Sequence, residues 1–170
     1  MARHWLNAAV LLGLCGFGAA LSAHRSPGPV TAPSGDVARL EESFARDPGD
    51  ASAAQALMRA YLENDAPGLA VSVVQRAPGA AFATPTSTDL ASRALLGAGR
   101  ATESLAVTRQ VVSRCDGEPC DANLVARAAR REQILTAMVE MGIEDADRDP
   151  AAVELALRRS TRQVRLAMAE

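Results

Sequence analysis

Three arginines recur at one position of a regular spacing, and their chemistry suits the binding of carboxylates. Arg59, Arg93 and Arg127 lie 34 residues apart. A guanidinium group donates two parallel hydrogen bonds to a carboxylate, so a row of such groups could hold an acidic polypeptide. One helical turn before each arginine stands another polar residue: Gln55, Asp89 and Asn123. Chance, together with the good helix propensity of arginine, is the alternative explanation of this spacing.

A close pair of cysteines, Cys115 and Cys120, is the second candidate for chemistry. They flank the turn-forming sequence Asp-Gly-Glu-Pro, and in an oxidising compartment such a pair is typical of a disulfide. The alternative is a redox pair, but redox motifs usually place two residues between the cysteines, whereas four intervene here. Two thiols do not complete a tetrahedral zinc site, so we expect no metal centre.

The sequence offers little else for catalysis. It contains no lysine, and beyond the first 23 residues its one histidine is His24. These absences exclude Ser-His triads, Schiff bases, histidine metal clusters and phosphate-binding loops that use a lysine. The acidic residues at 145–149 invite a calcium interpretation, but the glycine and distal glutamate of the helix-loop-helix calcium site are missing. We expect that loop to cap a helix, and we expect a non-catalytic protein without a cofactor.

The composition argues against nucleic acid as a partner. The chain has 170 residues, a formal charge of −2 and 3% aromatic residues, so it offers neither a basic field nor a platform for base stacking. Alanine and leucine carry the apolar fraction, which suits closely packed helices. All 18 basic residues are arginine, and together with the alanine content this indicates a GC-rich bacterial genome.

Residues 1–23 have the pattern of an export signal. An apolar run extends from Trp5 to about Leu21 and ends in small residues that are typical of a cleavage zone. The run is also near the lower length limit of a transmembrane helix, so an uncleaved membrane tether through residues 5–23 is the alternative. Residues 24–35 are rich in proline and glycine and should form an extended linker. In either case we expect the remaining chain in the bacterial periplasm or cell envelope.

Apolar spacing, caps and helix breakers predict an all-α fold. The expected helices cover residues 36–46, 51–64, 68–76, 87–96, 100–114, 122–141 and 150–169. When the sequence is slid over itself by 34 residues, several positions coincide: Tyr61 with Leu95, Asp65 with Gly99, Ala70 with Ser104, and Ala77 with Val111. A period of this length is typical of stacked helical hairpins.

This layout resembles the tetratricopeptide repeat family. That family places a bulky residue, a leucine, a small residue and an aromatic along its first helix, and then small, bulky and small residues along its second. The first repeat fills these slots with Ala54, Leu57, Met58, Tyr61, Ala70, Val74 and Ala77. The second repeat fills them with Thr88, Ala91, Ser92, Leu95, Ser104, Thr108 and Val111. The following helix keeps Ala122, Val125, Ala126 and Ala129, and the pattern fails after Arg131.

The resemblance covers residues 36–130 and implies a short right-handed solenoid of helical hairpins. We expect repeats over residues 36–118, and a degenerate third repeat with C-terminal capping helices over residues 119–170. In such a stack the concave groove would be lined by Gln55, Arg59, Asp89, Arg93, Asn123 and Arg127. An unrelated helical bundle is the alternative.

These observations predict an exported adaptor that binds a polypeptide segment, acidic in character, in its concave face. Two other functions stay open. The chain could be a membrane-anchored structural or assembly component of the cell envelope that forms a homo-oligomer through its C-terminal helices. It could also be a thiol redox protein, an interpretation that depends on Cys115 and Cys120 alone.

Overall fold

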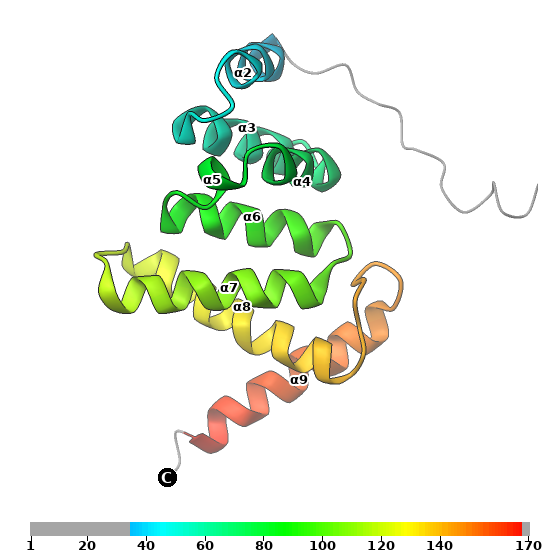
Figure 1. Ribbon diagram of the computed structural model, residues 1–170. Coiled ribbons are helices and arrows are strands. Elements are labelled where there is room, and N and C mark those ends of the chain that lie inside the picture. The colour runs from blue at the N-terminus through cyan, green and yellow to red at the C-terminus, as the bar shows by residue number, and fades with distance from the viewer. Residues whose placement is uncertain (1–34, 168–170) are drawn as a thin grey trace, which may run out of the picture. The chain divides into compact units, whose positions relative to one another are not determined.

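Helices account for all of the regular structure in the described part of the chain. The computed structural model describes residues 35–167, and for residues 162–167 it describes only the backbone. This part contains eight helices and no strand (Figure 1): α2 (Gly35–Arg46), α3 (Ala51–Glu63), α4 (Pro67–Arg76), α5 (Pro78–Ala81), α6 (Pro85–Gly97), α7 (Ala101–Gly117), α8 (Ala122–Glu140) and α9 (Pro150–Ala167). The predicted all-α class is confirmed. The predicted export segment at residues 1–23 and the linker residues 24–34 lie outside the described residues, and the last residue of the predicted linker, Gly35, begins α2.

Side-chain caps decide where α3 and α6 begin. Asp50 accepts a hydrogen bond from the backbone N–H two residues further on, at 2.8 Å, as its position before α3 predicts. The prediction of Thr86 or Ser87 as the cap of α6 is wrong. The N-cap is Thr84, which forms a capping box with Ser87, and Pro85 occupies the first helical turn. Proline is favoured there because its missing N–H would have no partner in any case.

The short helix α5 lies where the sequence predicts a helix-breaking Pro-Gly pair followed by a loop. The helix before Pro78 and Gly79 ends at Arg76 as predicted, but Pro78 then opens α5 where a loop was expected. Ala80 and Ala81 are 5% and 0% exposed, so this single turn buries apolar surface between the two hairpins. Proline fits the first turn of a helix as readily as it ends one, and burial of the alanines decides between the two outcomes.

Three helices end in a residue with a left-handed backbone. The φ angles are 53° at Asp65 after α3, 73° at Gly99 after α6 and 72° at Gly142 after α8. The next N–H in each case donates to the carbonyl five residues earlier: Ala66 to Tyr61 at 2.9 Å, Arg100 to Leu95 at 3.0 Å and Ile143 to Met138 at 2.9 Å. Such a residue is usually glycine, because a Cβ is strained there. Gly142 therefore ends α8 as predicted, and the 34-residue partners Asp65 and Gly99 share one backbone conformation.

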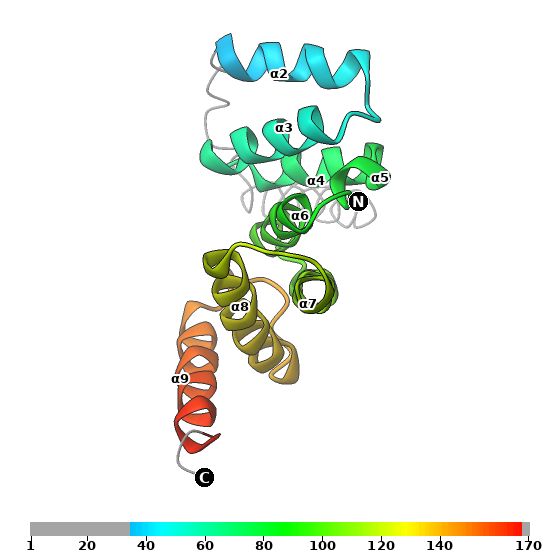
Figure 2. The same cartoon turned by 90° about the vertical axis from the view of Figure 1, so that its left-hand side faces the viewer.

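The helices pack chiefly on their neighbours along the chain (Figures 1 and 2). α3 pairs with α4, and α6 pairs with α7, while α6 also contacts both helices of the preceding pair. α2 packs on α3, α8 packs on α7 and touches α6, and α9 contacts only α8 among the described elements. This sequential packing means that each helix depends on the one or two beside it for burial of its apolar face.

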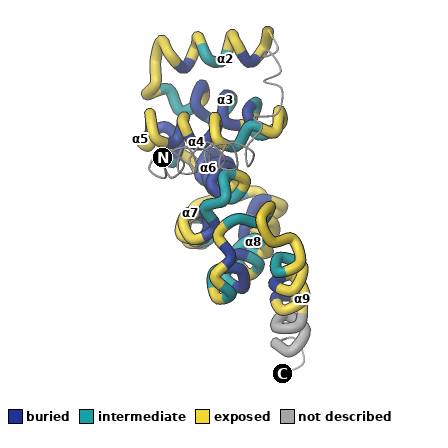
Figure 3. Tube along the Cα trace, turned by 90° about the vertical axis from the view of Figure 1, so that its right-hand side faces the viewer, coloured by how far each residue is buried: buried dark blue, intermediate teal, exposed yellow. Residues whose placement is uncertain are grey.

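Burial follows the predicted slots of the first two repeats and departs from those of the third (Figure 3). Every slot of the first and second repeats is 9% exposed or less, and Figure 3 shows buried stretches on α3, α4 and α6. The third-repeat slots were predicted to be Ala122, Val125, Ala126 and Ala129, but the first three are exposed and the last is half-buried. Leu124 and Ala128 are buried in their place, at 5% and 0%. The buried face of α8 is thus rotated from the predicted one, because α9 and the end of α7 cover it instead of a further repeat.

A seam of small hydroxyl residues joins α6 to α7. Ser92, Ser104 and Thr108 are each 0% exposed. The Ser92 Oγ lies 2.6 Å from Thr108 Oγ1 and 3.1 Å from Ser104 Oγ, and Ser104 Oγ donates to the Ser92 carbonyl at 2.8 Å. Small side chains let the two helices approach closely, and the mutual hydrogen bonds remove the cost of burying polar groups.

α9 buries a different stripe from the one predicted. Val153, Leu157, Val164 and Met168 were expected to pack on α8. Val153 is half-buried as expected, but Leu157 is 38% exposed, and the fully buried positions are Ala156 and Ser160. The other two side chains lie outside the described residues. Small residues at the contact allow α9 to lie close to α8, which leaves the larger leucines on the outside.

Tyr61 reports on the packing of α2 against α3. Its hydroxyl donates a hydrogen bond to Glu41 Oε1 at 2.7 Å. Burial, and then the hydrogen bond to Glu41 and the charge of that residue, raise the pKa of Tyr61 to about 12. The pKa of Tyr61 in the folded state lies above its unfolded value of about 10. The protonated tyrosine therefore stabilises the folded state fully below about pH 10, and this stabilisation is lost as the pH rises toward the folded pKa.

We expect an ultraviolet titration of the native protein to place tyrosinate formation near pH 12. Tyr61 is the one tyrosine of the chain, so the signal is unambiguous. The variant Glu41→Gln should lower the midpoint, because the negative charge is removed. The midpoint should stay above that of free tyrosine, because burial, the larger cause, remains. A native midpoint equal to that of the unfolded chain would contradict the contact.

Candidate partner-binding surface

The three predicted arginines lie on helices that are consecutive in the packing. Arg59 is on α3, Arg93 on α6 and Arg127 on α8, and α6 contacts both of the other helices. All three residues are exposed. None of them forms an ion pair with another residue of the described range. Their guanidinium groups therefore face solvent with their hydrogen-bonding capacity available to a ligand.

Asp89 does not belong to this exposed set. It is 5% exposed, and its carboxylate forms an ion pair with Arg131 of α8, whose side chain is 15% exposed. The prediction that Asp89 lines an open groove thus differs from its observed position between α6 and α8. A buried charge needs a partner of opposite sign, and Arg131 supplies it. Arg131 follows Arg127 by four residues, so both arginines lie on one side of α8. The pairing of Arg131 with Asp89 on another helix could not be read from the sequence.

The remaining two predicted polar residues serve local contacts. Gln55 of α3 is half-buried, and its Oε1 accepts a hydrogen bond from Thr84 Oγ1 at 3.5 Å, across to the start of α6. Asn123 is exposed in the first turn of α8, where its backbone N–H donates to Asp121 at 3.0 Å. Gln55 therefore connects α3 to the start of α6, and Asp89 connects α6 to α8.

Three surface hollows of the described chain lie away from the arginines. The largest, about 900 Å³, opens between α8 and α9 beside Arg130, Leu155 and Leu157. A second, about 310 Å³, lies between α4 and α7, and a third, about 280 Å³, lies between α2 and the α3–α4 pair. None of these three is lined by any of the six predicted groove residues. The exposed residues Arg59, Arg93 and Arg127, which we call the arginine surface, therefore line none of these three hollows.

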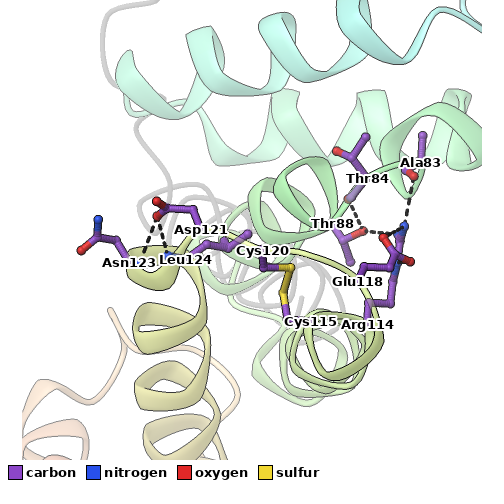
Figure 4. The surroundings of a disulfide bond; sticks show 10 residues. All are labelled: Ala83, Thr84, Thr88, Arg114, Cys115, Glu118, Cys120, Asp121, Asn123 and Leu124. Atoms are coloured by element: carbon purple, nitrogen blue, oxygen red, sulfur yellow. Dashed lines mark hydrogen bonds and ion pairs between the residues drawn. A yellow bond between two sulfur atoms is a disulfide. The ribbon is translucent and has the colours of Figure 1, made fainter.

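The predicted disulfide is present at the turn between α7 and α8 (Figure 4). Cys115 and Cys120 are joined with their Cα atoms 5.4 Å apart. Closing so short a loop should stabilise the fold by about 2 kcal/mol on the chain-entropy model. Next to it, Arg114 pairs with Glu118 and donates to the carbonyls of Phe82 and Ala83. The sequence analysis missed this contact, because its partners lie about thirty residues away along the chain.

The acidic loop before α9 serves helix ends. Asp149 accepts the N–H of Ala152 at 2.9 Å at the start of α9, as predicted, and Asp145 pairs with Arg148 at 3.0 Å. Glu144, which the sequence analysis did not single out, accepts hydrogen bonds from the hydroxyl and N–H of Thr102 at the start of α7. These hydrogen bonds, the hydroxyl one first, lower the pKa of the Glu144 carboxyl. A carboxylate also suits the positive end of a helix dipole.

The described residues contain no set of three His, Cys, Asp or Glu side chains arranged to hold a metal ion. No helix within residues 35–167 combines the length and apolarity needed to cross a bilayer. Comparisons of the chain with family models, curated proteins and solved structures return no match. Function must therefore be inferred from the residues of this chain alone.

Proposed function

We propose that this chain is an exported, non-catalytic adaptor that binds an acidic polypeptide segment against α3, α6 and α8. The observation that carries the proposal is that Arg59, Arg93 and Arg127 are exposed on α3, α6 and α8, where α6 contacts the other two helices. None of the three has an acidic partner in the described range. Arginines left unpaired on a folded surface can each fork onto a carboxylate of another chain.

A stack similar to tetratricopeptide repeats is the scaffold that we propose for this surface. Two features support it in the α3–α4 and α6–α7 pairs. The predicted slots of both pairs are buried, and the 34-residue partners Asp65 and Gly99 share a left-handed backbone with matching hydrogen bonds. In such a stack the first helices of the pairs lie side by side, as the contact between α3 and α6 requires.

α8 extends the arginine surface although its buried face departs from the repeat. The ion pair between Asp89 and Arg131 fixes which side of α8 turns toward α6. Arg127 stands one helical turn before Arg131 on that same side, and Arg93 stands one turn after Asp89 on α6. We propose that this orientation of the two helices brings Arg93 and Arg127 to one continuous surface.

The test compares binding to Glu-containing peptides with binding to their Gln-substituted counterparts. We expect immobilised extended peptides with several glutamates to bind the wild-type chain, and rising salt to weaken the binding. Reversal of charge in Arg59→Glu, Arg93→Glu and Arg127→Glu together should weaken binding by at least about tenfold, because three charge-assisted contacts become repulsive.

The matched control reverses three exposed arginines on other helices, Arg46 on α2, Arg76 on α4 and Arg109 on α7. This control carries the same change in net charge, and it should bind like the wild type. Equal loss in both triple variants, equal binding of the Gln peptides, or no binding of any peptide would overturn the proposal. N-terminal sequencing of the mature protein separately decides between a cleaved export signal and a membrane tether at residues 5–23.

A further inference from the structure

One side chain connects the disulfide turn to a distant part of the fold. Arg114 lies in the last turns of α7, and its Nη1 and Nη2 atoms donate to the carbonyls of Phe82 at 2.9 Å and Ala83 at 3.2 Å. Those carbonyls belong to the junction between α5 and α6. The same guanidinium is held from the other side by Glu118, with Nε–Oε1 and Nη2–Oε2 distances of 3.1 Å and 3.2 Å.

Glu118 lies within the loop that the disulfide closes. This glutamate follows the end of α7 (Figure 4). The side chains of Arg114 and Glu118 are 30% and 49% exposed, so water competes for their contacts. A partly exposed ion pair holds a single geometry only when its backbone is constrained. Two features constrain Glu118: its N–H donates to the Arg114 carbonyl at 2.8 Å, and the disulfide closes the loop that contains it.

We propose that the Cys115–Cys120 disulfide, Glu118 and Arg114 form a redox-sensitive latch on the α5–α6 junction, which we call the Arg114 latch. A dithiol reduces the bond: the S–S bond breaks, two electrons and two protons pass to the cysteines, and the dithiol becomes a disulfide. The loop then relaxes, Glu118 no longer orients the guanidinium, and Arg114 releases the carbonyls of Phe82 and Ala83. Both cysteines are only half-buried, so a dissolved dithiol can reach them.

Release of Arg114 affects helices on both sides of the disulfide turn. Release loosens the first turn of α6, where the N–H groups of Ser87 and Thr88 bond to Thr84. It also frees the start of α8, which follows Cys120 directly. None of the latch residues is one of the three arginines proposed to bind the peptide.

Hydrogen exchange measured by mass spectrometry tests the latch on the full-length chain. We expect dithiothreitol to speed exchange in residues 82–88 by roughly fivefold and to leave α3 unchanged, because local opening is limited to what the latch holds. The variant Arg114→Gln should show the same increase in its oxidised form, and reduction should add nothing further at residues 82–88. The double variant Cys115→Ser, Cys120→Ser should exchange like the reduced wild type, and dithiothreitol should not change its exchange rate.

Arg109→Gln is the matched control, because Arg109 is another arginine of α7 but pairs with Glu132 and not with the junction. It should behave like the wild type in both redox states. Unchanged exchange at residues 82–88 in the reduced protein would overturn the latch, as would a uniform increase across all helices. If reduction unfolds the chain, equal exchange in oxidised Arg114→Gln and Arg109→Gln would overturn it.

Discussion

Replacing Arg131 by methionine should lower the free energy of unfolding by about 3 kcal/mol, because the Asp89 carboxylate is then buried without a partner. The side chain of Asp89 is 6% exposed and that of Arg131 is 15% exposed, so water reaches neither group well. Methionine has a helix propensity similar to that of arginine and keeps an unbranched apolar stem, so the loss comes mainly from removing the guanidinium. Urea denaturation followed by circular dichroism measures the change.

Two further variants test whether the expected loss of stability comes from the unpaired Asp89 charge. The double variant Asp89→Leu, Arg131→Met should recover to within about 1 kcal/mol of the wild type, because no unpaired charge remains between α6 and α8. Arg127→Met, one turn away and exposed, should change stability by less than about 0.5 kcal/mol. If Arg131→Met costs no more than Arg127→Met, the buried ion pair does not hold these helices together.

The variant Gly99→Ala should destabilise the chain by about 2 kcal/mol, since a side chain there meets both strain and a clash. The φ angle of Gly99 is 73°, and an added Cβ would lie 2.9 Å from Cγ of Asp145. Asp145 comes from the loop after α8, so the clash also disturbs the contact of that loop with the start of α7. Thermal unfolding measures the loss.

A substitution at Asp65, which lies 34 residues before Gly99, should change stability in the opposite direction. Asp65 has φ of 53°, which an aspartate adopts at some cost. The variant Asp65→Gly should therefore gain up to about 1 kcal/mol, because glycine removes that strain. Shifts of the same sign in Gly99→Ala and Asp65→Gly would show that the two positions do not carry equivalent helix ends.

Features that depend on neighbouring residues were predicted well. Asp50 and Asp149 cap helices, Gly142 ends one, and Cys115 and Cys120 are joined, because each outcome depends on a few adjacent residues. The errors in local structure arose where two local signals compete. Pro78 can end one helix or begin another, and the burial of the alanines after it decided for α5.

Contacts between distant segments could not be predicted. Asp89 pairs with a residue 42 positions later, Thr102 bonds to Glu144 at the same separation, and Arg114 reaches carbonyls about thirty positions earlier. A long polar side chain can reach several places, and only the packing of the helices selects one. The exposure of Arg59, Arg93 and Arg127 was expected, but the burial of Asp89 beside them was not.

By itself the sequence determined the helical class, most helix ends, the disulfide and the buried slots of the first two helical pairs. Each of these follows from short-range spacing, in which side chains one or two turns apart face the same way. Only the tertiary structure decided how α8 is rotated, which face of α9 is buried, and which charges are paired. Those outcomes depend on which surfaces meet, and they are decided by the combined packing of α6, α7, α8 and α9 rather than by any one segment.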